Sequence, residues 1–429
     1  MQRLSTTDAD FTARFAALEA DTREPDRGVA GQVAQILERV KREGFRAVTD
    51  LTEKFDRVLL SAGSAEVSTT ERASAIARVP ADQRAALELA AGRIRAFHDA
   101  QRPADGSHSD ATGVRAGWRW TAVERAGLYV PGGRAAYPSS VLMNAIPAQV
   151  AGVDELVMVT PTPDNRLNPL VMLAAELAGV ARVFRIGGAQ AIAALAYGTA
   201  PVPRCDMIVG PGNAWVAEAK RQLYGTVGID MVAGPSEILV IADALARPDW
   251  IAADLLSQAE HDPVAQSILI TDSPTLADAV AEWVERLLPT LETEEAARES
   301  WDGYGAIILV QDLSEAAALS DALAPEHLEL MVADPAPLFG AIRHAGSVFL
   351  GSHTPEPIGD YIGGPNHVLP TGRRARFSGG LGVHNFLKRT TWLEAGAQGF
   401  AALADATATL ADAEGLSAHA LAVRIRNRP

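Results

Sequence analysis

The 429-residue chain contains a single cysteine, Cys205. One cysteine cannot form an intrachain disulfide, and it cannot supply a zinc cluster built from cysteine ligands. Cys205 stands at the start of the strand-like run V-P-R-C-D-M-I-V, which predicts a small buried core residue. We therefore expect no thiol-based covalent catalysis from this chain.

Basic residues and long apolar runs are also scarce. Lys and Arg number 38 against 53 Asp and Glu, giving a net charge of -15 that disfavours non-specific binding to nucleic acid or anionic lipid. The N-terminus, M-Q-R-L-S-T-T-D-A-D-F, lacks the apolar core of a signal peptide, and no later run approaches about 18 apolar residues. We expect a cytoplasmic protein with neither nucleic-acid nor membrane partners.

The chain also lacks a fixed-period repeat, a G-x-G-x-x-G fingerprint and a P-loop. What it has, from Ala126 onward, is an alternation of strand, glycine turn and helix, which predicts parallel sheets covered by helices on both faces. The expected strands are 127–130, 156–160, 182–186, 207–209, 237–241, 267–271, 306–310 and 347–350.

These patterns predict an α/β fold with two Rossmann-like parallel-sheet units and helical N-terminal and C-terminal extensions. The expected boundary between the units lies near A-G-P-S-E at 233–237. The expected regions are a mainly helical region at 1–125, a first α/β unit at 126–235, a second at 236–378, and a helical Ala-rich tail at 379–429.

Three glycine turns follow strands of the first unit: P-G-G at 131–133, G-G-A-Q at 187–190 and G-P-G-N at 210–213. In open α/β sheets, ligands bind beyond the carboxyl ends of the strands, where glycines admit a ligand close to the backbone. The turns are compatible with a dinucleotide site. They are equally compatible with a purely geometric role in short connections.

The stretch from Asp249 to Pro263 predicts a helix capped by Asp249 and stopped by Pro263. Gln258 and His261, three residues apart at its last turn, share one helical face. An amide oxygen beside an imidazole nitrogen forms half of a metal site. The alternative is a polar helix end whose histidine interacts with the helix dipole.

Three further segments carry titratable side chains. A-P-E-H-L-E-L at 324–330 places Glu326 beside His327, either as proton acceptors in one pocket or as part of a helix first turn. The Gly- and Pro-rich segment at 354–369 carries Asp360 and His367, and a long ordered loop of this kind usually has a functional reason. The tail carries Glu414 and His419, and exposure is the usual state of a terminus that is not docked.

Taken together, these motifs resemble the histidinol dehydrogenase family. The resemblance covers nearly the whole chain from about Val33, in the order and spacing of the family. The motifs that carry it are G-L-Y-V-P-G-G, Y-P-S-S-V-L-M-N-A, R-I-G-G-A-Q-A-I-A-A-L-A-Y-G-T, I-V-G-P-G-N, G-I-D-M-V-A-G-P-S-E, D-L-L-S-Q-A-E-H-D, A-P-E-H-L-E-L, G-D-Y-I-G-G-P-N-H-V-L-P-T and E-G-L-S-A-H. One departure is the pair Arg373 and Arg374, in a loop that is usually less basic.

The resemblance implies a zinc- and NAD-dependent enzyme that oxidises L-histidinol to L-histidine through the aldehyde, using two NAD, as the last step of histidine biosynthesis. Glu326 and His327 would be the acid–base pair, with His327 accepting the alcohol proton and Glu326 activating water. One zinc per subunit would be bound by Gln258, His261, Asp360 and His419. NAD would contact Tyr129, Gln190 and Asn213. Substrate would contact Ser236, Gln258, His261, His327, Asp360, His367, Glu414 and His419.

The resemblance also implies a homodimer in which the C-terminal tail reaches the active site of the partner subunit. Other functions remain open at the level of sequence. They are a relative that oxidises another small amino or sulfonated alcohol, a zinc hydrolase in which Glu326 activates water without NAD, and a non-enzymatic NAD-binding module.

Overall fold

The computed structural model describes residues 1–21, 23, 28–132, 137–232 and 234–426. Gly133 of the first glycine turn and Ala233 at the expected boundary lie outside the described residues. Contacts divide the chain into two units. The main unit comprises residues 1–101 and 124–386, and the small unit comprises residues 102–123 and 387–429.

The main unit contains a five-stranded parallel sheet with the order β6-β5-β4-β7-β8. Its strands are β4 (Arg125–Tyr129), β5 (Glu155–Val159), β6 (Arg182–Phe184), β7 (Met207–Val209) and β8 (Gly228–Ile229). Apolar residues of four helices pack into one core cluster with the sheet: α2 (Val29–Glu43), α3 (Phe45–Asp56), α8 (Gly188–Tyr197) and α9 (Ala214–Leu223). The helices α4 (Thr69–Ile76), α5 (Ala81–Asp99), α6 (Pro138–Ala151) and α7 (Pro169–Leu177) form a second packed group.

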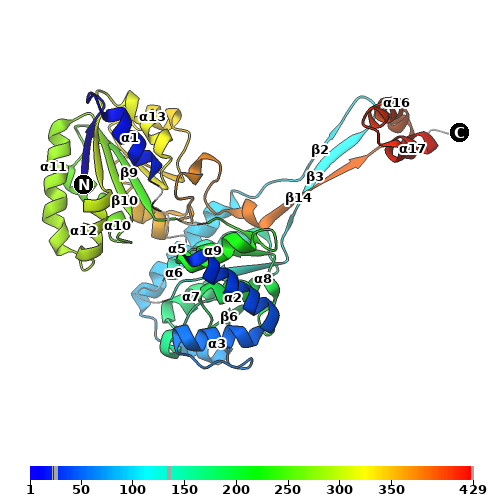
Figure 1. Cartoon of the computed structure of the whole chain (residues 1–429), viewed down its shortest axis with the longest axis horizontal. Helices are drawn as coiled ribbons and strands as arrows, with labels where there is room; N and C mark the ends of the chain where they lie inside the picture. Colours follow the sequence, from blue (N-terminus) through cyan, green and yellow to red (C-terminus); the bar gives the residue numbers. More distant parts are fainter. Residues whose placement is uncertain (22, 24–27, 133–136, 233, 427–429) are drawn as a thin grey trace. The chain divides into compact units, whose positions relative to one another are not determined.

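A second parallel sheet of the main unit has the order β1-β11-β10-β9-β12-β13. Its strands are β1 (Gln2–Ser5), β9 (Glu237–Ala242), β10 (Gln266–Thr271), β11 (Ala306–Leu309), β12 (His327–Met331) and β13 (Ser347–Leu350). Two core clusters cover its faces (Figure 1). One holds α10 (Pro248–Ala259), α11 (Pro274–Leu287) and α12 (Glu294–Tyr304), and the other holds α1 (Phe11–Ala20), α13 (Ser314–Leu323) and α14 (Ala336–Ala341).

Both sheets share one topology once β1 is set aside. In each sheet, the first three strands in sequence lie side by side in order, and the fourth lies on the other side of the first strand. This order creates a switch point between β4 and β7 in the first sheet and between β9 and β12 in the second. Crevices at such points are where open α/β sheets bind ligands. The expected fold class of two Rossmann-like parallel sheets is therefore confirmed.

Local sequence signals account for the starts of two helices. Asn168 and Ser273 cap α7 and α11 with their side-chain oxygens, each ahead of a proline at the first helical position. The start of α10 was predicted wrongly, because it begins at Pro248 after Arg247. Asp249 lies in its first turn, where its carboxylate pairs with Arg247. The N-terminal region also contains a strand, β1, that its helical pattern did not predict.

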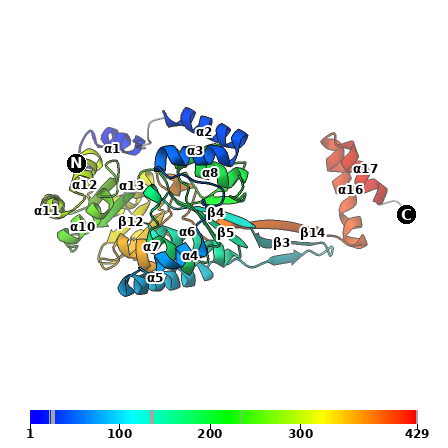
Figure 2. The ribbon, with the colours of Figure 1, turned by 90° about the horizontal axis from the view of Figure 1, so that it is seen from below.

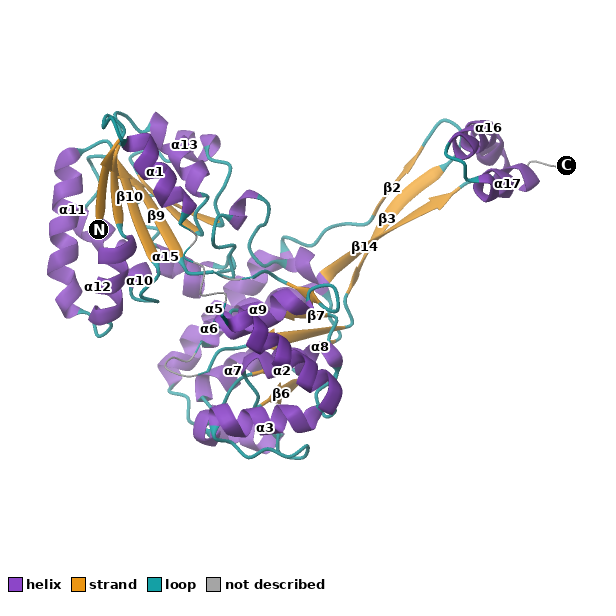
Figure 3. Cartoon of the chain, in the orientation of Figure 1, coloured by secondary structure: helices purple, strands orange, loops and turns teal. Residues whose placement is uncertain are grey.

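The small unit contains an antiparallel sheet of β2 (Gly106–Ser109), β3 (Arg115–Ala122) and β14 (Leu387–Glu394), drawn in orange in Figure 3. The helices α16 (Ala397–Ala413) and α17 (Ser417–Arg426) follow and pack against each other (Figure 2). The expectation of a helical tail at 379–429 is wrong for β14. Its eight residues pair along the whole of β3, and this long-range partner is not visible in a local pattern.

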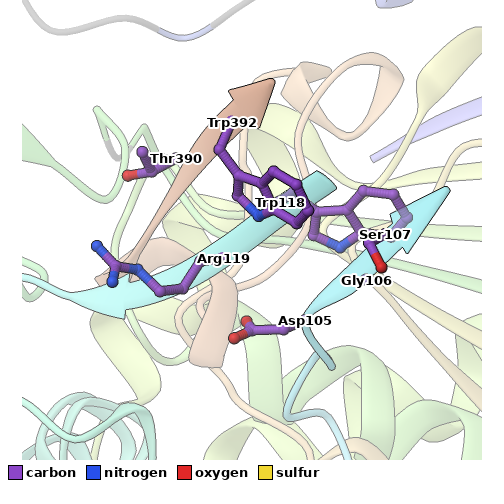
Figure 4. A pocket seen from close by; sticks show the side chains of 7 residues that line it. All are labelled: Asp105, Gly106, Ser107, Trp118, Arg119, Thr390 and Trp392. Carbon is purple, nitrogen blue, oxygen red and sulfur yellow. The ribbon is translucent and has the colours of Figure 1, made fainter. Parts of the chain in front are cut away.

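Tryptophans cover the glycines of this small sheet. A Cβ atom at Gly106 would lie 2.3 Å from the Trp118 ring, and one at Gly117 would lie 2.4 Å from the Trp392 ring. The two indoles also line a surface pocket together with Arg119 (Figure 4). Trp118 therefore packs on its own sheet.

Among the described residues, no helix combines the length and the apolar character that crossing a bilayer requires. Cys205 is 1% exposed, and burial raises the pKa of its thiol to about 12. The expectation of a buried core cysteine is confirmed, and the raised pKa keeps the thiol in its unreactive protonated form at neutral pH.

Candidate functional site

The candidate site lies at the amino-terminal edge of the second sheet. β9 begins at Glu237 and β12 begins at His327, and their parallel register pairs Ile238 with His327. Gln258 is the penultimate residue of α10, which leads into the start of β10. In most open α/β sheets, ligands bind at the opposite, carboxyl-terminal edge. The second sheet therefore presents its polar side chains at the edge that this rule does not predict.

One ring nitrogen of His327 forms hydrogen bonds, and the other has no hydrogen-bond partner. Its Nδ1 lies 3.1 Å from the Glu237 carbonyl oxygen and 3.0 Å from Gln258 Oε1. A carbonyl can only accept, so Nδ1 carries the proton and Nε2 carries the lone pair. Nε2 is buried without a hydrogen-bond partner. Burial lowers the pKa of His327 to about 4, against the opposing pull of Asp360, so the ring is a neutral base at pH 7.

Glu326 lies beside His327 with an opposite shift. Its Oε2 accepts a hydrogen bond of 3.0 Å from the Glu237 backbone N–H and lies 3.8 Å from His327 Nδ1. Burial, and then the neighbouring Glu237 carboxylate, raise the pKa of Glu326 well above its ordinary value. A carboxyl group with a raised pKa is a stronger base once ionised, as water activation requires.

Two more carboxyl groups face the free nitrogen of His327. Glu356 Oε1 and Asp360 Oδ1 each lie 3.8 Å from Nε2, and one donor atom from each of the three residues lies within 4.8 Å of the others. These carboxyl groups come from the short helix α15 (Glu356–Ile358) and the π-helical turn η3 (Gly359–Gly363). Such turns are frequent at functional sites. Burial is the main cause that raises the pKa of both groups.

The surroundings suit a divalent cation. The Nδ1 atoms of His261 and His367 lie 2.9 Å from the carbonyls of Ser257 and Asp360, so each ring presents its Nε2 lone pair. Fixing a ring by a bond at its other nitrogen is typical of metal-binding histidines. Gln258 is fully buried, and its side-chain nitrogen has no partner. Imidazole nitrogen with carboxylate and amide oxygen is a donor set that zinc accepts.

The structure brings most of the predicted site residues together. Gln258, Glu326, His327 and Asp360 lie around the same edge, and the charge of His261 influences the pKa of Asp360. The backbone carbonyl of Ser236 precedes Glu237 at the start of β9 and accepts from Arg23. His367 Nε2 lies 3.4 Å from Ser140 Oγ. Glu414 and His419 belong to the small unit, where both are exposed.

The expected NAD contacts lie at the carboxyl-terminal edge of the first sheet. Tyr129 ends β4, and its hydroxyl accepts a hydrogen bond of 3.2 Å from the Gly188 N–H. Asn213 follows β7 and caps α9 with its carbonyl oxygen, which leaves its amide hydrogens to a ligand. Gln190 is buried in the first turns of α8. At Gly210 a Cβ atom would lie 2.1 Å from the Tyr129 carbonyl, so only glycine fits between β4 and β7.

Sequence reasoning missed Glu356 and Glu237. Glu356 stands four residues before Asp360 in T-P-E-P-I-G-D, and a helical turn there would have placed both on one face. The sequence indicated only that Glu237 begins an apolar strand. Glu237 contacts the site residues through its backbone N–H and carbonyl groups. No residue-type signal reports a backbone contact of that kind.

A sequence model described as histidinol dehydrogenase matches residues 20–427. The chain is 59% identical over 425 residues to the histidinol dehydrogenase of Ruegeria pomeroyi, and 58% identical over 421 residues to that of Zymomonas mobilis. Each alignment covers 98% or more of both proteins. The crystal structure of histidinol dehydrogenase from Elizabethkingia anophelis superposes with a TM-score of 0.95 at 34% identity, covering 99% of this chain and 98% of that one.

The geometry of His327 predicts a fixed tautomer. We expect 15N-resolved NMR of histidine-labelled protein to show Nδ1–H and an unprotonated Nε2 from pH 8 down to about 5, since the pKa lies near 4. His327→Asn identifies the resonance. A His327 signal that becomes doubly protonated near pH 6.5 would contradict the assignment of a neutral base.

Proposed function

The chain belongs to the histidinol dehydrogenase family, and from this premise we propose that it oxidises L-histidinol to L-histidine through the aldehyde, with zinc and two NAD, in histidine biosynthesis. The enzyme is thus an oxidoreductase. The observation that carries the detailed proposal is the buried pair at the start of β12. His327 is a neutral base with a free Nε2, and Glu326 is a carboxyl group with a raised pKa.

His327 serves the first oxidation. Its Nε2 accepts the hydroxyl proton of histidinol while the carbinol carbon loses a hydride and becomes the aldehyde carbon. The imidazolium that forms is stabilised by Glu356 and Asp360, whose oxygens lie 3.8 Å from Nε2. NAD supplies the hydride acceptor for each of the two oxidations.

Glu326 serves the second oxidation. Its ionised carboxyl accepts a proton from a water molecule whose oxygen bonds to the aldehyde carbon, giving the anion of the hydrate. Loss of a second hydride from that carbon leaves the carboxylic acid, which releases its proton to give the carboxylate of histidine. Two hydrides leave in all, which accounts for two NAD. Water as the nucleophile fits a chain whose only thiol is buried and protonated.

Gln258, His261 and Asp360 would hold the zinc, with His419 of a second copy as the fourth ligand. A bound zinc would supply a Lewis acid that holds the amine and imidazole nitrogens of the substrate, since zinc has no redox chemistry of its own. The excess of buried carboxyl groups at this edge supports a resident cation. Ser236, His367 and Glu414 complete the proposed substrate contacts, beside the ligands and His327.

Tyr129, Gln190 and Asn213 are proposed to contact NAD. Support for Tyr129 and Asn213 comes from their place at the switch point of the first sheet, where β4 and β7 are neighbours and their connections leave in opposite directions. Gln190 lies in the first turn of α8, where the Gly188 N–H donates to the Tyr129 hydroxyl. The glycine turns there allow a ligand to approach the backbone closely. This assigns nicotinamide binding to the first sheet and proton transfer to the second.

We propose a homodimer in which the small unit serves the partner's site. The buried positions of α16 are small residues, Gly399, Ala404, Ala408 and Ala411, whereas its larger apolar side chains point to solvent. Exposed apolar residues on the two tail helices are Leu403, Leu410, Leu421 and Ile425. Apolar surface of this kind marks a protein interface, and a second copy is the partner that the proposed ligand His419 requires.

The reaction stoichiometry tests the proposed activity. We expect close to two NADH per histidinol from the unmodified protein, and close to one, with release of the aldehyde, from Glu326→Gln. Glu299→Gln, an exposed glutamate, is the matched control. Because the pKa of Glu326 is raised, the rate with histidinaldehyde should increase with pH more steeply than the rate with histidinol. Absence of NADH from the unmodified protein would exclude a dehydrogenase and leave the zinc hydrolase reading.

Asp360→Asn tests the metal site. The variant removes one carboxylate ligand, and we expect zinc affinity to fall by at least about 100-fold, since even residues that support ligands cost 10–100-fold. Asp262→Asn, which changes an exposed carboxylate next to His261, is the control and should bind zinc normally. Competition against a zinc chelator measures both. Equal affinities in the two variants would place the metal elsewhere.

Mixing two defective variants tests the shared site. His419→Ala and Glu326→Ala homodimers should each fail to oxidise the aldehyde to histidine. Heterodimers formed by unfolding and refolding them together should regain up to about a quarter to a half of the unmodified rate per dimer, because one of the two sites is intact. Verified heterodimers without activity would show that His419 does not act on the partner's site.

A further inference from the structure

Glu237 contacts both proton-transfer residues with its backbone. Its N–H donates to Glu326 Oε2 at 3.0 Å, and its carbonyl accepts from His327 Nδ1 at 3.1 Å. Glu237 therefore orients the Glu326 carboxyl group, and together with Gln258 Oε1 it sets the tautomer of the His327 ring. Both functions depend on where the first residue of β9 lies.

The side chain of Glu237 is anchored from the N-terminal segment. Arg23 forms an ion pair with Glu237 Oε1, with side chains that are 1% and 9% exposed. The Gly372 N–H donates to the same carboxylate oxygen at 3.3 Å. Arg23 lies before α2, more than 200 residues away in sequence, so the contact is specific to the folded chain.

The Arg23 guanidinium also ties together the starts of two neighbouring strands. Nη1 donates to the Val264 carbonyl at 2.9 Å, just before β10, and to the Ser236 carbonyl at 3.3 Å, just before β9. Arg373 adds a second positive charge near the same carboxylate, and it donates to the Leu18 carbonyl at 3.1 Å. This gives a structural role to one of the two arginines that depart from the family pattern.

A buried ion pair adds little net stability, because desolvation of both charges offsets their attraction. The effect of this pair is instead to fix a backbone position with several directed hydrogen bonds. The Asp230–Lys220 pair of the first sheet shows the same device, since Asp230 accepts from the Gly210 N–H and Lys220 donates to the Gly210 carbonyl. Each sheet thus has one buried ion pair that fixes the backbone beside its candidate site.

We propose that Glu237 is a positioning residue for both Glu326 and His327, and that Arg23 of the N-terminal segment holds it in place. The proposal rests on the proposed function, because its catalytic consequence is the alignment of two proton acceptors. Loss of the anchor frees the start of β9 to shift, and both acceptors shift with it. Displacements of about 1 Å in such groups cost up to about 100-fold in rate.

The decisive variant is the double substitution Arg23→Met with Glu237→Gln. It removes both charges of the Arg23–Glu237 pair together, so neither partner is left charged and buried without the other, and neutral replacement of this kind usually preserves folding. We expect kcat for NADH formation from histidinol to fall about 10- to 100-fold, with the KM for NAD within about twofold. The single variant Arg23→Lys, which keeps the positive charge beside Glu237, should retain a large part of the kcat of the unmodified protein. Arg3→Met, which removes the exposed ion pair to Asp278, should leave kcat unchanged.

A substrate-free readout separates this proposal from the proposed function. The Nδ1–H resonance of His327 should shift in the double variant and stay in place in Arg3→Met, whether or not histidinol is the substrate. A folded double variant with an unchanged His327 resonance and kcat within twofold of the unmodified protein would overturn the proposal. A lower melting temperature with unchanged kcat per folded protein would do the same, since it would show a purely structural ion pair.

Discussion

The parallel pairing of β9 with β12 is the constraint on which the candidate site depends. It sets Ile238 opposite His327, so the backbone of the preceding residue, Glu237, meets the side chains of both Glu326 and His327. A slip of one residue would turn His327 to the other face of the sheet, because successive side chains alternate. The apolar residues of β9, buried on both faces, make such a slip costly. Packing of the core thereby fixes the positions of Glu326 and His327 at the edge of the sheet.

Burial of charge is the second constraint. Glu237, Glu326, Glu356 and Asp360 gather where solvent is largely excluded, and burial raises the pKa of each of them. Arg23 balances one of these groups through an ion pair. The remaining carboxyl groups are stabilised either by protons or by a cation, and the imidazole of His261, whose Nδ1 donates to the Ser257 carbonyl, contributes to the electrostatics of Glu356 and Asp360. The same excess of acid that favours a metal keeps Glu326 a strong base.

Much of this architecture could be predicted from sequence, and the failures have physical causes. Strand positions followed from apolar runs between glycine turns, and caps such as Asn168 and Ser273 fixed helix starts. β14 escaped prediction because a strand exposed on an isolated sheet has no apolar signature, and its partner β3 lies over 260 positions earlier. The sequence also did not predict which edge of the second sheet holds the site, for another reason. Gln258 stands at the end of α10 and His261 in the turn that follows, and a helix that leads into a strand ends at the amino edge of the sheet.

The composition of the tail helices explains why their titratable residues stand on a small unit. α16 buries alanines against α17 and leaves leucines exposed, the reverse of the order that stabilises a free-standing helical pair. Alanine burial contributes little free energy compared with leucine burial. In the proposed homodimer, a second copy would cover the exposed leucines and supply the apolar burial that the tail helices lack on their own. The same docking would bring Glu414 and His419 to the partner's site, so assembly and activity would depend on the same hydrophobic burial.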